Sequence, residues 1–203
     1  MEPLHFSLPG YQVNEYMIVL SPHEELCLRI QKIKEEFAAK LQMPRTRSMR
    51  PHLGLVSFMG LDMLEDKLVH RLQHVALGMA PFKVEIKDFG SFPTHSIFLN
   101  VTSRLPVQLL LKELASARQL MRLNAANKPN FHTEPHIIIA RRLKPWQYEQ
   151  GWQEYSQRQF TGRFIADSML LLKRRSGEKG AFQVAGRFEF MNLPVTTKQA
   201  SLF

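Results

Sequence analysis

Residues 50–58 read RPHLGLVSF and residues 134–142 read EPHIIIARR, so a proline and a histidine twice stand before a short apolar run. Runs of this length that are rich in Leu, Ile and Val are typical of buried β-strands. A histidine is therefore expected at the start of each of two similar strands, His52 on the first and His136 on the second. The repetition indicates a shared role for the two rings.

The alternation of side chains along a strand predicts which residues accompany each histidine. Counted in steps of two, the predicted faces are His52, Gly54 and Val56 against Leu53 and Leu55, and His136, Ile138 and Ala140 against Ile137 and Ile139. By the same count, Ser57 points away from His52. If the two strands meet across a cleft, one imidazole, with an ordinary pKa of about 6.5, can accept a proton while the other donates one.

The segments around these strands predict a similar order of elements twice. A helix precedes each histidine strand, and a helix and two strands follow it. In the first half the predicted elements are a strand at 16–20, a helix from a Ser21 cap to Leu41, a basic loop at 43–50, a helix from Asp62, and strands at 82–89 and 96–101. In the second half they are a helix from about Pro106 that carries Met121, a polar loop at 124–130, a helix at 145–157, and a closing hairpin of strands at 164–173 and 182–190.

This order predicts an α+β protein in which residues 1–203 form one bilobal domain. Each of the two related lobes is expected to hold a small sheet backed by helices. With 44% hydrophobic residues, a chain of 203 residues is long enough to bury a substantial core.

Charge and cysteine content narrow the expected partners and compartment. The 27 basic and 18 acidic residues give a net charge of +9, which suits RNA or a nucleotide as partner, although many basic enzymes only carry a solvated basic surface. The single cysteine, Cys27, allows no internal disulfide and no cysteine-based zinc site. The N-terminal residues do not resemble a secretory signal, and no apolar run approaches the ~20 residues of a membrane span. We expect a cytoplasmic protein without a membrane partner.

Other chemistries lack their simplest signatures in this sequence. His132 and His136 are four residues apart, but Pro135 between them prevents the helix that would bring both onto one metal ion. His70 and His74 are also four apart on an expected helix, where a third ligand is missing. There is no phosphate-binding P-loop, no G-x-G-x-x-G and no G-x-S-x-G. We therefore expect no metal and no cofactor.

The two motifs PHLGL, residues 51–55, and PHIIIAR, residues 135–141, resemble those of the 2H phosphoesterase superfamily. This superfamily includes 2′-5′ RNA ligases and RNA 2′,3′-cyclic phosphodiesterases, and its members carry two H-x-[T/S]-x motifs. The order of elements and the final hairpin are similar as well, so the resemblance covers nearly the whole chain. It implies two mostly antiparallel sheets with a central cleft between them.

The resemblance also implies roles for individual residues. His52 and His136 match the two catalytic histidines, and Arg141 matches the basic residue that ends the second motif. Gly54 and Ile138 stand where the family has its phosphate-binding hydroxyl residues, so both hydroxyls are missing and phosphate binding is expected to be weaker.

Residues near the motifs are candidates for compensating this loss. Arg50 lies two residues before His52 and is the strongest candidate for a phosphate ligand. Phe131 and His132 precede the second motif, where they can stack on a base or contact phosphate, and packing or solvation is the alternative for each.

The expected function is a hydrolase that uses no metal. It would act on a 2′,3′-cyclic phosphate or a 2′-5′ phosphodiester of RNA or a nucleotide, with either histidine as base and the other as acid. The alternative is a nucleotide- or RNA-binding module on the same fold that has lost turnover. The missing hydroxyls favour this alternative, and the retention of both histidines opposes it.

Overall fold

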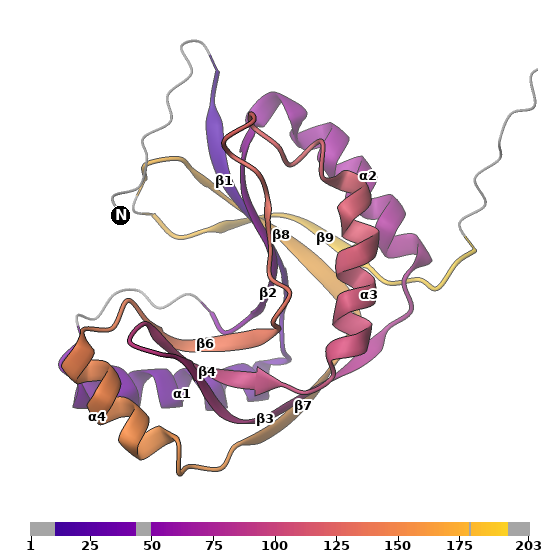
Figure 1. The fold of residues 1–203 in the computed structure, drawn as a ribbon. Helices are drawn as coiled ribbons and strands as arrows, with labels where there is room; N and C mark the ends of the chain where they lie inside the picture. The colour runs from indigo at the N-terminus through magenta and orange to yellow at the C-terminus, as the bar shows by residue number, and fades with distance from the viewer. Residues whose placement is uncertain (1–10, 44–49, 179, 195–203) are drawn as a thin grey trace, which may run out of the picture.

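The chain folds around two antiparallel sheets, as a computed structural model shows for residues 11–43, 50–178 and 180–194 (Figure 1). The five-stranded sheet has the order β5-β2-β1-β8-β9, with β5 at Asn130–Phe131, β2 at Leu53–Leu61, β1 at Val13–Leu20, β8 at Ser168–Arg175 and β9 at Gln183–Glu189. The four-stranded sheet has the order β6-β4-β3-β7, with β6 at His136–Arg141, β4 at Ser96–Val101, β3 at Phe82–Phe92 and β7 at Thr161–Ala166. The expected α+β class is confirmed, and each histidine strand belongs to a different sheet.

Two helices cover one face of each sheet (Figure 1). Helices α1, Glu24–Lys40, and α4, Pro145–Tyr155, pack on the four-stranded sheet. Helices α2, Glu65–Gly78, and α3, Arg104–Leu114, lie along the five-stranded sheet, and short 3-10 turns at Asp62–Leu64 and Ala115–Ala117 adjoin them. The buried apolar residues form one cluster that includes both sheets.

Helix α1 shows why these segments become helices. Its buried residues Leu26, Ile30 and Phe37 recur on one face. The acidic residues Glu24 and Glu25 lie in its first turn, where their negative charges interact favourably with the helix dipole. The expected cap at Ser21 is wrong. Nδ1 of His23 accepts the hydrogen bond from the Leu26 amide and caps the helix instead.

The final hairpin was expected to begin with one strand at 164–173, which is wrong. Strands β7 and β8 are separated at Asp167 and belong to different sheets: Ala166 pairs with Phe82 in the four-stranded sheet, and Ser168 pairs with Glu189 in the five-stranded sheet. Because apolar residues lie on both sides of Asp167, the sequence does not indicate that the strand ends there. The carbonyl of Asp167 accepts a hydrogen bond from the Phe190 amide at the crossing point.

The remaining boundaries differ from the expected ones by a few residues. Strand β3 continues through Gly90 to Phe92, and α3 ends at Leu114, before Met121. The basic loop at 43–50 lies mostly outside the described residues. In the described part of the chain, no helix combines the length and the apolar character that a membrane crossing requires.

Candidate active site

The two predicted histidines occupy equivalent positions in the two sheets. His52 directly precedes β2, and His136 is the first residue of β6. Strands β2 and β6 contact each other although they belong to different sheets. The two histidine strands therefore lie next to each other where the sheets meet.

Both imidazole rings are oriented by the same main-chain contact. Nδ1 of His52 lies 2.8 Å from the carbonyl oxygen of Arg50, and Nδ1 of His136 lies 2.6 Å from the carbonyl oxygen of Glu134. A carbonyl oxygen only accepts hydrogen bonds, so Nδ1 carries the hydrogen in each ring. Nε2 is then the ring atom that can accept a proton when the ring is neutral and donate one when it is charged.

Both histidine strands carry a β-bulge three residues after the histidine. In β2 the register passes from Gly54, opposite Val19, to Val56, opposite Ile18, so Leu55 is the extra residue. In β6 it passes from Ile138 to Ala140, opposite Phe98 and Ile97, so Ile139 is the extra residue. A bulge shifts the alternation of the strand by one residue.

The bulges correct the predicted faces. Val56 and Ala140 were expected beside the histidines, but both are buried on the opposite face. Ser57 was expected to point away from His52, but it lies on the same face as Gly54. Its partner on β1 is Met17 and that of Gly54 is Val19, two residues apart on one face of β1.

Arg141 reaches the His136 face through the same shift. Ser96 opposes it on β4, and Asn100 opposes His136, so both lie on one face of the sheet. Without the bulge, the odd spacing between the two residues would place Arg141 on the other face.

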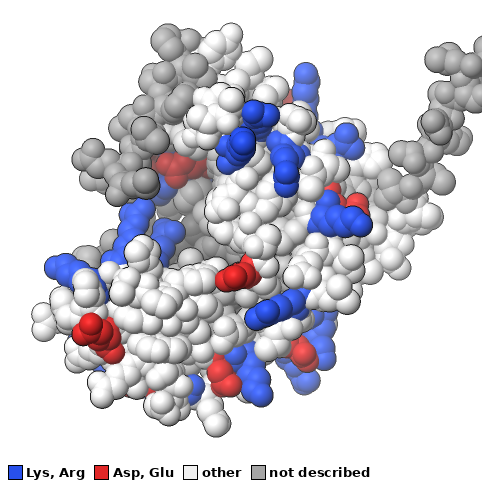
Figure 2. Space-filling view, in the orientation of Figure 1, with Lys and Arg blue, Asp and Glu red and all other residues white. Residues whose placement is uncertain are grey.

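The histidine faces point away from the helices. Tyr16 and Lys173, on the other face of the five-stranded sheet, both hydrogen-bond to Glu65 of α2. In the four-stranded sheet, Phe89 contacts Tyr155 of α4 and opposes Leu99, on the face of Ile137 rather than His136. The space between the sheets is thus lined by the two histidine faces, and Figure 2 shows a hollow there with Lys and Arg side chains at its edge.

The site is electrostatically positive. Burial lowers the pKa of His52 from 6.5, and the charges of Lys34 and Arg141 lower it further. Burial also lowers the pKa of Lys34 to about 8, with a further contribution from Arg141. Desolvation lowers the pKa of Arg141 as well, and the charges of Arg142 and of Arg174 in the five-stranded sheet contribute to that shift. Like charges held together in this way favour an anionic ligand.

Arg50, the expected phosphate ligand, has contacts through both its side chain and its main chain. Its guanidinium forms an ion pair with Glu24 at the start of α1. Its carbonyl is the group that orients His52. Arg50 thus orients His52 through its main chain, and no pattern in the sequence indicated the contact of its side chain with Glu24.

Phe131 and His132 lie next to β2. Phe131 opposes Val56, packs against the core, and has the guanidinium of Arg118 over its ring at 4.8 Å from the centroid, so its ring is held by packing. His132 donates its main-chain N–H to the carbonyl of Leu55 at 2.9 Å, and its side chain lies beside Gly54.

Two aromatic residues that the sequence analysis did not single out surround His136. The ring centroids of Phe98 and Phe92 lie 4.7 and 5.3 Å from that of His136. Phe98 opposes Ile138 on β4, and Phe92 is 37% exposed. Only the pairing of β4 with β3 and with β6 brings these rings to the histidine, so sequence spacing could not indicate them.

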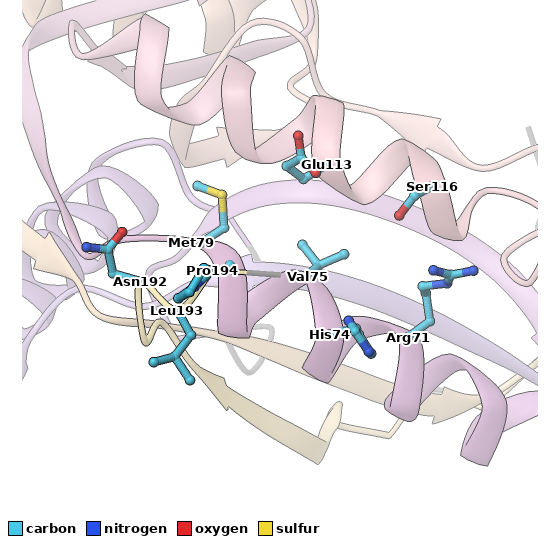
Figure 3. A pocket seen from close by; sticks show the side chains of 10 residues that line it. Arg71, His74, Val75, Met79, Glu113, Ser116, Asn192, Leu193 and Pro194 are labelled. Carbon is cyan, nitrogen blue, oxygen red and sulfur yellow. The ribbon is translucent and has the colours of Figure 1, made fainter. Parts of the chain in front are cut away.

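A separate pocket of about 690 Å³ lies between α2, α3 and residues 192–194 (Figure 3). Arg71 and His74 of α2 and Glu113 of α3 line it, and neither His52 nor His136 does. Within residues 11–43, 50–178 and 180–194, no three His, Cys, Asp or Glu side chains are grouped so that they could hold a metal ion, the pair His70 and His74 included.

Comparison with known proteins gives a family match and several structural matches. A model of the 2′-5′ RNA ligase superfamily matches residues 22–178. The sequence matches no curated protein. The crystal structure of LigT from E. coli in complex with 3′-AMP is similar with a TM-score of 0.58 and 16% identity, over 88% of this chain and 98% of that one.

Two further crystal structures have similar values. The complex of E. coli LigT with NADP+ matches with a TM-score of 0.55 and 18% identity, over 90% of this chain and 99% of that one. TT0787 of Thermus thermophilus matches with a TM-score of 0.60 and 18% identity, over 87% of this chain and 98% of that one. This chain therefore shares its fold with these proteins.

Proposed function

The chain belongs to the 2′-5′ RNA ligase superfamily, the 2H phosphoesterases, and on this premise we propose that it is a phosphoesterase that uses His52 and His136 without a metal ion. Its proposed substrate is a 2′,3′-cyclic phosphate or a 2′-5′ phosphodiester of RNA or a nucleotide. The structures of E. coli LigT with 3′-AMP and with NADP+ support a nucleotide as the ligand class.

The observation that carries this proposal is the matched orientation of the two histidines. Each ring donates its Nδ1 hydrogen to the carbonyl oxygen two residues earlier, which leaves Nε2 as the nitrogen for proton transfer. A histidine with a purely structural role does not require a second histidine with the same main-chain contact in the other sheet. An acid and a base that act on opposite sides of one phosphorus atom each need a ring nitrogen that can exchange a proton, and Nε2 is that nitrogen in both rings.

His52 is the proposed base, because its lowered pKa keeps the ring neutral at pH 7. In hydrolysis of a cyclic phosphate, Nε2 of His52 takes a proton from water as the water oxygen forms a bond to phosphorus. The bond from phosphorus to one ribose oxygen breaks, and the charged His136 gives its Nε2 proton to that oxygen. Water then returns both rings to their starting protonation states.

The positive residues of the site would hold the phosphate during this step. Arg141 shares the face of His136, and its fixed charge matches a phosphoryl oxygen. Lys34 adds positive charge that favours the anion over a neutral ligand, whereas the charge of Arg174 is partly balanced by its ion pair with Glu15.

The alternative is a binding module without turnover, and Ile138 is the observation that favours it. Ile138 is half-buried on the His136 face, opposite Phe98, where its apolar side chain offers no hydrogen bond to phosphate. Such a protein would retain a nucleotide without converting it.

Turnover of 2′,3′-cyclic nucleotides and of 2′-5′-linked dinucleotides tests the proposal. His52→Ala and His136→Ala are each expected to lower kcat by 100-fold or more, within the range of about 10²–10⁴ for a general acid or base. His70→Ala on α2 is the control and is expected to leave kcat unchanged. Activity that survives a chelator supports the metal-free mechanism. Activity that needs added metal would overturn it, and binding without turnover would favour the alternative.

A further inference from the structure

The space beside Gly54 is occupied by another side chain of the site. A Cβ atom placed on Gly54 would lie 3.6 Å from Cδ2 and 3.9 Å from Nε2 of His132. These are ordinary contact distances, so the edge of the imidazole with Nε2 faces the place where a side chain at position 54 would stand. In the 2H motif this is the position of the phosphate-binding hydroxyl.

The main chain holds His132 at this place. Its N–H donates to the carbonyl of Leu55, the bulged residue of β2, at 2.9 Å. Phe131 before it pairs with Val56 and is covered by the guanidinium of Arg118. Because these contacts involve the main chain of His132 and the side chain of its neighbour, they do not depend on the imidazole.

His132 is also electrostatically linked to both histidines of the proposed mechanism. Its charge contributes to lowering the pKa of His52. Burial lowers the pKa of His132 itself, and the charge of His136 lowers it further. Three imidazoles thus share the site, and a neutral His132 still has one N–H to donate.

We propose that His132 binds the substrate phosphate in place of the hydroxyl that Gly54 lacks, so that its imidazole N–H donates to a phosphoryl oxygen. This inference rests on the proposed function, because it assigns a ligand to the same phosphate. It gives Gly54 a reason as well: a Cβ at this position already reaches contact distance of the ring, so a γ atom of threonine directed toward the ring would compete with His132 for the same space.

A set of variants at the two positions tests this replacement. His132→Ala is expected to weaken binding of inorganic phosphate and to raise KM for a 2′,3′-cyclic nucleotide about tenfold, the effect of one hydrogen bond to a charged group. His132→Phe keeps a ring against Gly54 but has no N–H, and it is expected to show the same loss. His70→Ala is the matched control away from the site, and a melting curve checks that each variant is folded.

The decisive comparison is the effect of a threonine at position 54 with and without His132. In the otherwise unchanged protein, Gly54→Thr is expected to bring no gain, because its side chain competes with the imidazole for one place. In the His132→Ala variant, Gly54→Thr is expected to restore most of the lost affinity. Gly54→Val has the same shape without the hydroxyl and is expected to restore none.

Each result separates this inference from the proposed function. An unchanged phosphate affinity in His132→Ala and His132→Phe overturns the inference, as does a gain from Gly54→Thr that is equal in both backgrounds. If these variants leave phosphate binding unaffected while turnover persists, the inference alone fails. If phosphate binding follows the expected pattern but no cyclic phosphate or 2′-5′ dinucleotide is converted, the proposed function alone fails.

Discussion

The carbonyl groups of Arg50 and Glu134 determine which atom each histidine can use. Because both accept from Nδ1, the two rings offer the same nitrogen to a substrate, and their roles are then separated by their surroundings. Burial of His52 opposes its protonation, and the charges of Lys34 and Arg141 add to this effect. At the scale of single residues, the site therefore favours a neutral ring at position 52.

This electrostatic coupling predicts the effect of pH on activity. The pKa of His52 is lowered from 6.5, so kcat/KM is expected to be lost only as pH falls below about 6.5, when His52, the proposed base, becomes protonated. Removing a neighbouring positive charge raises this pKa. Lys34→Met is thus expected to move the acid limb of the pH profile to higher pH, and Lys32→Met, an exposed residue of the same helix, is expected to leave it in place. An acid limb that does not move in Lys34→Met would contradict the coupling.

At the scale of elements, sequence could predict the histidine strands but not the details of their faces. The Pro-His pairs and the apolar runs after them indicated both strands correctly. A bulge leaves no mark in an apolar run such as LGLV or IIIA, because each of its residues can be buried. For this reason, the positions of Ser57 and Arg141 followed only from the register with β1 and β4. His132 was recognised as a candidate, whereas its contact with Gly54 needed the pairing of β5 with β2.

The packing of α4 on α1 gives a prediction for these elements. A Cβ atom on Gly151 of α4 would lie 2.8 Å from two ring atoms of Phe37, which is 1% exposed and has little room to move. Alanine is favoured over glycine within a helix by about 1 kcal/mol. Overpacking costs about 1–3 kcal/mol, so Gly151→Ala is expected to lower the melting temperature. In a protein that already carries Phe37→Leu, adding Gly151→Ala is expected to lower the melting temperature by less, because the smaller side chain leaves room for the new methyl group.

Gln150→Ala serves as the control for this experiment, because Gln150 is the exposed neighbour of Gly151 on the same helix. It is expected to change the melting temperature little. A Gly151→Ala protein that melts at a higher temperature than the unchanged protein would show that helix propensity outweighs the contact with Phe37.

At the scale of the whole molecule, the two halves of the chain exchange strands. The hairpin of β3 and β4, from the first half, joins the second histidine strand, and the hairpin of β8 and β9, from the second half, joins the first. The element order predicted two related lobes but could not indicate this exchange, because hairpins of either half can extend either sheet. Since β7 and β8 are joined through Asp167 alone, damage to one sheet is expected to reach the other.

Tryptophan fluorescence can measure this coupling, because both tryptophans, Trp146 and Trp152, lie on α4 beside the four-stranded sheet. Ile18 is fully buried in β1 of the five-stranded sheet. Ile18→Ala is expected to cost about 2–5 kcal/mol of unfolding free energy. At roughly 2–4 °C per kcal/mol for a chain of this size, the melting temperature should fall by about 4–20 °C.

If the exchanged strands make the molecule cooperative, the fluorescence of α4 and the far-ultraviolet circular dichroism of the whole chain should show the same lowered midpoint in Ile18→Ala. Met63→Ala, at a residue 66% exposed near the same sheet, is the control and should leave both midpoints unchanged. Two sheets that unfold independently would give a different result: the circular dichroism would show an early loss, and the fluorescence midpoint would stay at its original temperature. That outcome would mean that the crossing at Asp167 connects the sheets without coupling their stability, and that the two histidines depend on separately stable halves.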